Sequence, residues 1–266
     1  MVTLNSMQLD RITQNQLFSM PYFRGMLRAC EQRFYEEQDL AQPVLDIGAG
    51  DGHFAQAMLE QKMMFGIDPW WEPLLEAKER RAYGLLVQGT GDRIPAPASV
   101  FPAAMSNSVL EHIPNVQPVL NDVYRCLTTG GKFYFAVPNA RFKTDLWGMK
   151  VLSTIGLKGL ATFYSKFFNN ISRHVNLDTP ETWKARLTEA GFLHVESFNY
   201  FPIWDMQMLE RGHLFCIMTL LYKKLFGKWI LFPSTKNPFI PYRKVRELVE
   251  NPFCEDGTGT FFVATK

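Results

Sequence analysis

A glycine-rich turn follows a short apolar segment near residue 45. In VLDIGAGDGHF (44–54), Gly48, Gly50 and Gly52 stand two residues apart. Glycine lets backbone N–H groups come close to a ligand, and the N-terminus of a following helix carries positive potential. A strand, a glycine turn and a helix in this order predict an anion- or nucleotide-binding corner.

The spacing of the glycines argues against a phosphate ligand. A dinucleotide fingerprint is G-x-G-x-x-G, and a P-loop requires a lysine directly after its last glycine. This chain has G-x-G-x-G, with Asp51 inside the turn and no lysine after Gly52. Because a carboxylate in the turn would repel a pyrophosphate, we expect a ligand other than a pyrophosphate.

A second acid, Asp68, closes the segment GIDPW at the end of the next apolar run. A carboxylate at this place can accept hydrogen bonds from both hydroxyls of a ribose, each charge-assisted bond contributing about 1.5 to 3 kcal/mol. A dinucleotide-binding fold places an acid there for the same reason. Asp68 therefore indicates a ribose without deciding which cofactor carries it.

The segments that must position these residues alternate between strand-like and helix-like patterns. Expected strands are 43–47, 63–68, 85–91, 103–108, 132–139, 194–201 and 257–266. Expected helices are 22–38, 54–62, 72–84, 116–131 and 183–192. Repeated alternation of this kind predicts a mostly parallel sheet with helices on both faces.

Two stretches resemble class I S-adenosylmethionine (SAM)-dependent methyltransferases. Asp46–Gly52, DIGAGDG, resembles the first motif of that family, and Gly89–Asn115, GTGDRIPAPASVFPAAMSNSVLEHIPN, resembles a later one in order and spacing. Pro102 departs from the family pattern, which has an acid there. The resemblance covers roughly residues 43–139, with a weaker echo at 173–192. It implies an α/β, Rossmann-like, doubly wound sheet of seven mostly parallel strands with an antiparallel last strand and helical cap insertions.

The resemblance also implies SAM as cofactor and assigns its contacts. Asp46 would order the turn and contact the methionine ammonium, and Asp68 would hold the ribose. Pro69 and Trp70 would lie beside adenine, although Trp70 and Trp71 suit a core equally well. The remaining implied contacts are Gly48, Ala49, Gly50 and Gly52 along the turn, Asp92 and Arg93 at adenine, and Asn107 and Ser108 at the methionine moiety.

Methyl transfer needs a base only if the acceptor holds a proton that must leave. His112 follows the fourth expected strand near the place where the methyl group should point, and imidazole titrates in a suitable range. A structural histidine that bonds its own loop is the alternative. His174, beside Asn176, ends an insertion and is the second candidate, with a surface or capping role as its alternative.

We expect one methyltransferase domain over residues 1–266. It would comprise an N-terminal helical lid (1–42), a SAM-binding core (43–138) and two cap insertions (139–178 and 202–256) that form the acceptor side. The insertions mix large apolar residues with lysines, at Lys150, Lys158 and Lys166 and again at Lys223, Lys224 and Lys228. This composition indicates peripheral contact with a membrane or a lipophilic acceptor. The alternative is that the helices pack together and keep their lysines in water.

The composition of the chain argues against several other classes of protein. With 28 basic and 26 acidic residues the net charge is +2, so no overall field attracts nucleic acid. Four well-separated cysteines give no metal-binding spacing, and no apolar run approaches the roughly 20 residues of a membrane span. The N-terminal residues lack a secretory pattern, so a cytoplasmic location is expected.

The sequence thus predicts a SAM-dependent methyltransferase that acts by in-line displacement on a small or lipophilic acceptor. Two alternatives stay open, a non-catalytic SAM-binding regulatory protein and an NAD-dependent oxidoreductase. The acceptor, the atom methylated and the oligomeric state are not determined by the sequence.

Overall fold

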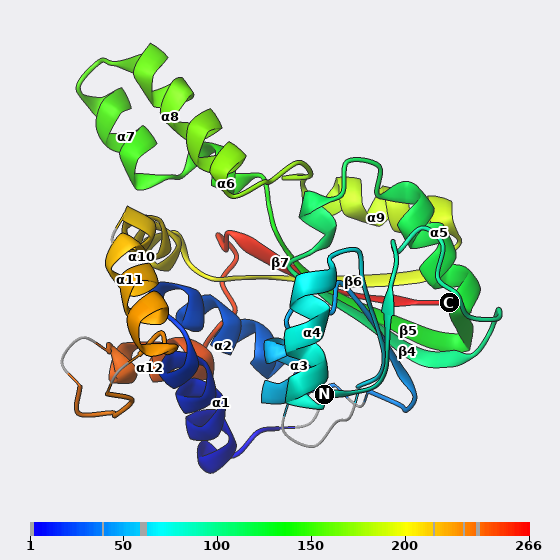
Figure 1. The fold of residues 1–266 in the computed structure, drawn as a ribbon. Coiled ribbons are helices and arrows are strands. Elements are labelled where there is room, and N and C mark those ends of the chain that lie inside the picture. The colour runs from blue at the N-terminus through cyan, green and yellow to red at the C-terminus, as the bar shows by residue number, and fades with distance from the viewer. Residues whose placement is uncertain (1–2, 39, 59–62, 215, 231, 238–239) are drawn as a thin grey trace. The chain divides into compact units, whose positions relative to one another are not determined.

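The computed structural model describes residues 3–38, 40–58, 63–214, 216–230, 232–237 and 240–266. Within these residues the strands form one seven-stranded sheet, drawn as arrows in Figure 1. In spatial order the strands are β3 (Tyr83–Gln88), β2 (Met63–Asp68), β1 (Val44–Ile47), β4 (Phe101–Asn107), β5 (Leu127–Pro138), β7 (Gly259–Thr265) and β6 (His194–Tyr200).

The direction of the strands confirms the predicted fold class. β1 pairs in parallel with β2 and with β4, β2 with β3, and β4 with β5, whereas β7 runs antiparallel to β5. The chain starts in the middle of the sheet, moves outward to β3 and returns beside β1 as β4. In sheets of this kind the ligand lies outside the carboxyl ends of the strands, at the point where the order reverses. That point lies between β1 and β4.

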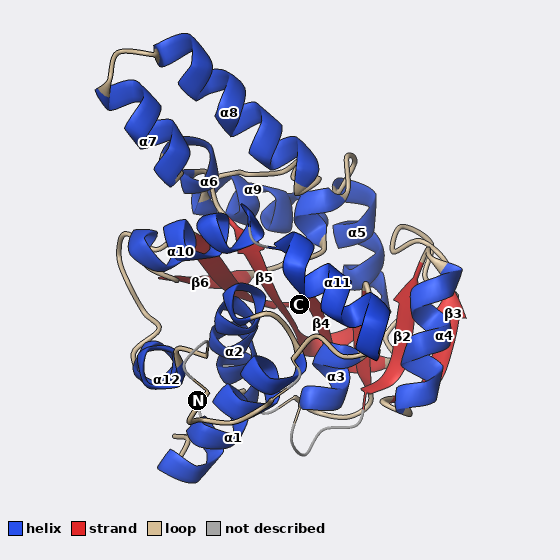
Figure 2. Cartoon of the chain, turned by 60° about the vertical axis from the view of Figure 1, so that its left-hand side comes forward, coloured by secondary structure: helices blue, strands red, loops and turns tan. Residues whose placement is uncertain are grey.

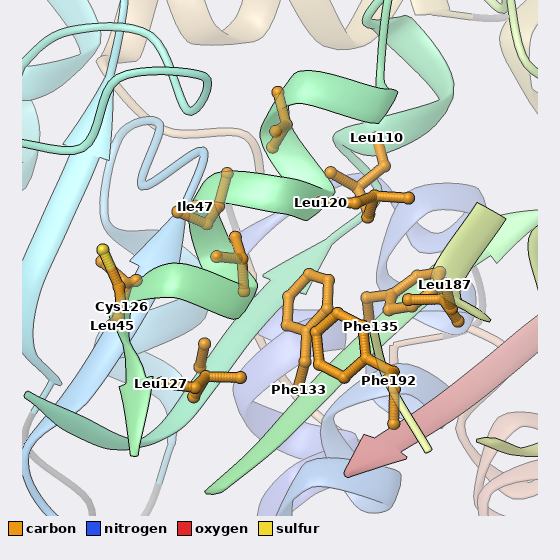
Figure 3. Close-up of a cluster of buried hydrophobic side chains, with 14 of the residues drawn as sticks. Leu45, Ile47, Leu110, Leu120, Cys126, Leu127, Phe133, Phe135, Leu187 and Phe192 are labelled. Carbon is orange, nitrogen blue, oxygen red and sulfur yellow. The ribbon is translucent and has the colours of Figure 1, made fainter. Parts of the chain in front are cut away.

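An apolar cluster packs one face of the sheet against α5 (Gln117–Cys126) and α9 (Pro180–Ala190). β1 is buried at every position because helices cover both faces of a parallel sheet. Figure 3 shows side chains of this cluster, including Phe133, Phe135 and Phe192. The ring of Phe135 also stacks on Phe262 of β7, with ring centroids 4.7 Å apart. Burial of these large side chains supplies the main stabilisation, about 25 cal/mol for each Å² of apolar surface removed from water.

The helices that accompany the sheet differ from expectation mainly at their ends. They are α3 (His53–Ala57), α4 (Trp71–Arg80), the 3-10 turn η1 (Leu110–His112), α5 (Gln117–Cys126) and α9 (Pro180–Ala190). Part of the helix expected over 54–62 lies outside the described residues. The helix expected over 116–131 ends at Cys126, because Gly130 and Gly131 exchange backbone hydrogen bonds with Lys266 and belong to β5.

The chain divides into two compact units. The first, here called the helical unit, contains residues 1–38, 141–168 and 199–258, and the second, the sheet unit, contains residues 39–140, 169–198 and 259–266. The helical unit holds the segments expected to form the lid and most of both insertions. Residues 169–178, expected to belong to the first insertion, lie in the sheet unit instead. The lid and acceptor-side roles stay predictions.

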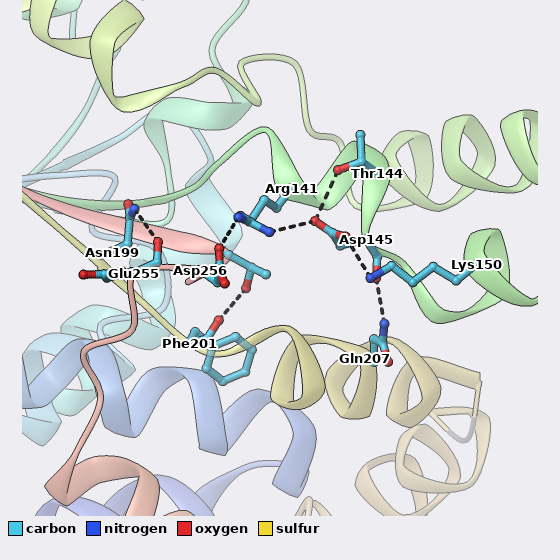
Figure 4. Close-up of polar contacts among 10 residues, drawn as sticks. Arg141, Thr144, Asp145, Lys150, Asn199, Phe201, Gln207, Glu255 and Asp256 are labelled. Carbon is cyan, nitrogen blue, oxygen red and sulfur yellow. Dashed lines mark hydrogen bonds and ion pairs between the residues drawn. The ribbon is translucent and has the colours of Figure 1, made fainter.

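The helical unit is built from α1 (Ser6–Ser19), α2 (Tyr22–Glu36), α6 (Arg141–Thr144), α7 (Trp147–Thr154), most of α8 (Lys158–Ile171), α10 (Ile203–Leu214), α11 (Cys216–Phe226) and α12 (Tyr242–Glu250). Figure 2 shows α7 and α8 as neighbouring helices joined by a short turn. At the base of this hairpin Asp145 bonds to Arg141 and Lys150, and its carbonyl accepts from Gln207, as Figure 4 shows.

Candidate functional site

The turn after β1 requires glycine at each of its three glycine positions. Gly48, Gly50 and Gly52 have φ values of 82°, 52° and 72°. A Cβ on Gly48 would lie 2.4 Å from the side chain of Val109, and one on Gly52 would lie 2.9 Å from the backbone of Ala77. A Cβ on Gly50 would meet nothing closer than 4.0 Å. The first and third glycines therefore permit close packing, while the middle one faces open space.

Asp68 joins the end of β2 to this turn. One carboxylate oxygen accepts the backbone N–H of Gly50 at 2.9 Å, and the other accepts that of Trp70 at 2.9 Å. The side chain is 7% exposed. Each carboxylate oxygen can accept more than one hydrogen bond, so both retain capacity for a pair of ligand hydroxyls.

Asp46 is buried in β1, one strand away from Asp68. Its carboxylate accepts the hydroxyl of Tyr83 at 2.6 Å, and that hydroxyl also lies 3.3 Å from the carbonyl oxygen of Ala49. Burial raises the pKa of Asp46 to about 7; the hydrogen bond from Tyr83 opposes this rise, and the nearby charge of Asp68 adds to it. Asp46 and Tyr83 together brace the turn.

Three carboxylates surround the glycine turn. Burial raises the pKa of Tyr83 well above its usual range, and the charges of Asp46, Asp51 and Asp68 add to this rise. Asp51 lies 3.6 Å from the guanidinium of Arg80, which also donates to the Asp51 carbonyl at 2.9 Å. An acidic corner of this kind attracts a cation and repels a pyrophosphate. SAM, with its positively charged sulfonium and ammonium groups, fits this group of carboxylates.

The loops after β2 and β3 carry the residues expected at adenine. Pro69, Trp70 and Trp71 are exposed, which excludes a core role for either tryptophan. Asp92 and Arg93 are also exposed, in the loop that follows β3. Asp122 and Arg125 of α5 fix this loop. Asp122 accepts the N–H of Ile94, and Arg125 donates to the carbonyls of Ile94 and Ala96.

Asn107 and Ser108 lie at the end of β4, on the β4 side of the point where the strand order reverses. Both are half-buried, and Ser108 adopts a left-handed conformation with φ of 52° while its N–H donates to the carbonyl of Ala136 at 2.9 Å. Val109 follows and packs on Gly48. The structure thus brings the end of β4 against the glycine turn, as the predicted site requires.

The structure brings the two candidate histidines together. The rings of His112 and His174 stack with centroids 5.7 Å apart and an angle of 17° between their planes. Nδ1 of His112 lies 2.9 Å from the carbonyl oxygen of Arg173, and Nδ1 of His174 lies 3.0 Å from Oδ1 of Asn169. Because a carbonyl oxygen only accepts, Nδ1 of His112 carries a proton. In the neutral ring Nε2 is then the basic atom.

Asn176 positions this pair. Its buried side-chain amide donates to the carbonyl oxygens of Leu110 at 3.2 Å and Ile113 at 2.6 Å, and the carbonyl of Glu111 accepts the N–H groups of Val175 and Asn176. These bonds tie the segment before α9 to the turn η1. Nε2 of His112 lies 3.6 Å from the carboxylate of Glu111, which is 1% exposed.

Sequence reasoning missed Tyr83, Asp122 and Arg125. Tyr83 lies in a segment expected to end a helix, and no spacing links it to Asp46. Asp122 and Arg125 stand three residues apart in α5 and form an ion pair at 2.6 Å, a pattern that the sequence shares with many exposed helices. Only their contact with the loop after β3 distinguishes them.

The described parts of the chain carry neither a metal-binding cluster nor a membrane-spanning helix. No group of three or more His, Cys, Asp or Glu side chains that could hold a metal ion occurs there. Cys30 and Cys126 are buried free thiols and Cys254 is half-buried, whereas the side chain of Cys216 lies outside the described residues. None of the described helices combines the length and the apolar character that a bilayer crossing demands.

The sequence profile of a methyltransferase domain family matches residues 22–197. The match spans more than half of the chain, so the chain belongs to this family. The protein is an enzyme, a SAM-dependent methyltransferase with a Rossmann-like fold, and the oxidoreductase and non-catalytic alternatives fall away.

Curated relatives and solved structures agree with this assignment. The ubiquinone biosynthesis O-methyltransferase of Salmonella typhimurium is 26% identical over 175 residues, which cover 64% of this chain and 70% of the relative. The enzyme of the same name from Vibrio atlanticus is 30% identical over 112 residues, covering 40% of this chain and 47% of the relative.

Among solved structures, a possible histamine N-methyltransferase from Thermotoga maritima superimposes with a TM-score of 0.56 at 15% identity, covering 91% of this chain and 90% of that one. Phosphoethanolamine N-methyltransferase 2 of Haemonchus contortus, in complex with phosphomonomethylethanolamine and S-adenosylhomocysteine, gives a TM-score of 0.56 at 16% identity, covering 90% and 52%. At these identities the likeness shows the fold.

Asp46 generates a prediction about stability. Its pKa is 3.8 ordinarily and about 7 in the folded chain, so the folded state holds a proton between these pH values that the unfolded state has lost. The free energy of unfolding should therefore fall as pH rises from about 4 to 7. Asp46→Asn removes the cost of ionising a buried carboxyl group. The variant should therefore be more stable than wild type at pH 8, by on the order of 4 kcal/mol, but equally stable at pH 4.

Urea unfolding at both pH values measures this difference. Asp122→Asn is the matched control with the opposite sign. Burial raises the pKa of Asp122, but hydrogen bonds from Arg125 and Ile94 outweigh burial and hold it below its usual value. Loss of the Asp122 carboxylate should therefore destabilise the folded chain at pH 8. Equal stability of wild type and Asp46→Asn at pH 8 would contradict an ionised, buried Asp46.

Proposed function

We propose that this enzyme methylates a hydroxyl oxygen of a small or lipophilic acceptor, with His112 as the base. The observation that carries the proposal is the stacked pair of His112 and His174, because Nε2 of His112 is left as its basic atom. A hydroxyl group must lose its proton as it attacks, which gives a base a purpose. The curated relatives are named as O-methyltransferases, which supports oxygen as the atom methylated.

The acidic corner supplies the cofactor contacts of this proposal. Asp68 receives both ribose hydroxyls, and Asp46 faces the methionine ammonium behind the turn formed by Gly48, Ala49, Gly50 and Gly52. Pro69 and the loop with Asp92 and Arg93 receive adenine, and Asn107 and Ser108 line the methionine side. Asp68 is already fixed by two backbone hydrogen bonds, so binding the ribose costs little ordering of the carboxylate.

When bound, SAM supplies an electrophilic methyl group whose transfer turns a sulfonium into a neutral thioether. The residues of the chain hold the acceptor oxygen in line with that methyl group, which can contribute about 7 to 11 kcal/mol in well-oriented systems. As the oxygen–carbon bond forms, Nε2 of His112 takes the hydroxyl proton. His174 keeps the ring of His112 in place by stacking, and Asn176 holds the loop that carries it.

Asp68→Ala should weaken SAM binding about tenfold or more, because losing two charge-assisted hydrogen bonds exceeds the roughly 1.4 kcal/mol that tenfold requires. Titration calorimetry with SAM measures the change, with NAD as a control ligand. Asp51→Ala is the matched variant, since it removes an acid from the same turn without removing a predicted ribose contact. Equal SAM affinity in folded Asp68→Ala and wild type would refute the ribose assignment.

His112→Asn should lower kcat by about 10² to 10⁴ while leaving SAM affinity unchanged, because the asparagine amide can still donate to the Arg173 carbonyl but cannot take a proton. Turnover is measured against phenols, long-chain phenols and amines as acceptors. The loss should shrink with a phenol that is already ionised at the assay pH. His174→Asn serves as the comparison, with a smaller loss expected. Full activity of His112→Asn on a neutral phenol would rule out His112 as the base.

A further inference from the structure

One helix of the helical unit has two apolar faces. The buried side of α8 is formed by Ala161, Ser165 and Phe168. On its other side Leu160, Phe163 and Phe167 are 50%, 64% and 54% exposed, and the rings of the two phenylalanines stack at 6.3 Å. Their spacing of three and four residues places all three on one helix face. A helix that only packs within its own protein needs a single apolar stripe.

The exposed face continues into the turn between α7 and α8. Ile155 is 64% exposed and Leu157 is 47% exposed, on either side of Gly156, whose φ of 84° makes the turn. We call the five residues Ile155, Leu157, Leu160, Phe163 and Phe167 the hairpin patch. Five exposed large apolar side chains within 13 residues indicate an interaction site.

The charged residues of α8, the helix that carries most of the hairpin patch, are all lysines. Lys158 and Lys166 of α8 are exposed, and so is Lys143 at the base of the hairpin. No Asp or Glu occurs from residue 146 to residue 177. Lys150 is different, because it is paired with Asp145 at 2.9 Å. The patch therefore has a basic rim.

Buried contacts hold the hairpin independently of the patch. The carboxylate of Glu210, fully buried, accepts the N–H groups of Trp147 and Gly148 at the start of α7 and the hydroxyl of Tyr164 in α8, the last at 2.6 Å. The aromatic ring of Tyr164 packs where a Cβ on Gly148 would stand. The patch is thus displayed on a fixed support, and its exposed side chains can be changed without removing that support.

A second segment of the helical unit also combines exposed apolar residues with lysines. In α11 and after it, Leu220, Leu221 and Leu225 are 51%, 46% and 64% exposed, and Lys223, Lys224 and Lys228 are exposed among them. No acid occurs from residue 211 to residue 246. Exposed leucines, phenylalanines and lysines without acids thus occur twice in the helical unit.

We propose that the hairpin patch docks this enzyme on the surface of an anionic lipid bilayer. The apolar side chains enter the boundary between headgroups and acyl chains, and Lys158 and Lys166 contact lipid phosphates, as in interfacial amphipathic helices. A second copy of this chain is a poorer occupant, since it would oppose one lysine rim to another. Protein interfaces in general are depleted in lysine. The α11 lysines add to the same attraction.

Cosedimentation with vesicles tests the proposal. Wild-type protein should bind phosphatidylcholine vesicles that contain phosphatidylglycerol about tenfold or more tightly than vesicles of phosphatidylcholine alone. Phe163→Ser with Phe167→Ser, and separately Lys158→Glu with Lys166→Glu, should each weaken binding to the anionic vesicles about tenfold or more. High salt should reduce wild-type binding, since it screens the lysines.

Matched controls separate the patch from general surface character. Leu193→Ser, at a 77% exposed leucine of the sheet unit, and Lys132→Glu, at an exposed lysine of β5, should leave vesicle binding unchanged. SAM titration of every variant reports whether the fold survives, and it also distinguishes loss of docking from loss of the methyltransferase site. The proposal is overturned if wild type ignores anionic vesicles, if the patch variants bind as wild type does, or if light scattering shows that the patch joins two copies in a dimer.

Discussion

The two backbone hydrogen bonds to the Asp68 carboxylate are the contacts on which the cofactor corner depends. The bond from Gly50 connects the glycine turn after β1 to the end of β2, and the bond from Trp70 fixes the carboxylate within its own loop. The same acid cannot leave this place without releasing the N–H of Gly50, in a turn whose glycines all have positive φ. This one side chain therefore fixes the turn and also contributes to its negative charge.

The acids around this corner carry an electrostatic cost that the ligand can offset. Asp46 is held with a raised pKa beside Asp68, and Tyr83 supplies its hydrogen bond. A cationic ligand would stabilise the ionised form, because opposite charges in a poorly solvated place interact strongly. The arrangement suits a sulfonium nucleoside for the same reason that it rejects a pyrophosphate.

Support for the histidine pair comes from backbone carbonyls, from asparagine side chains and from the buried carboxylate of Glu111, which lies 3.6 Å from Nε2 of His112. His112 bonds a carbonyl, and Asn176 ties the turn η1 to the segment before α9. This separates the group that would move a proton from the groups that hold it in position. In the helical unit, support and contact are likewise made by different residues. Glu210 fixes the α7–α8 hairpin from its buried side, and the exposed face of α8 is available for contact with other molecules.

The sequence alone predicted the class of this protein, because the spacing of Gly48, Gly50 and Gly52 and the motif at residues 89–115 are local features that resemble SAM-dependent methyltransferases, and the family match over residues 22–197 confirmed it. The alternation of apolar runs likewise determined the sheet. Tertiary structure decided that His112 and His174 stack, that Tyr83 bonds Asp46 and that residues 127–131 extend a strand instead of a helix. Each of these depends on residues distant in the chain, or on backbone pairing with the last strand. Such contacts leave no periodic trace in a single sequence.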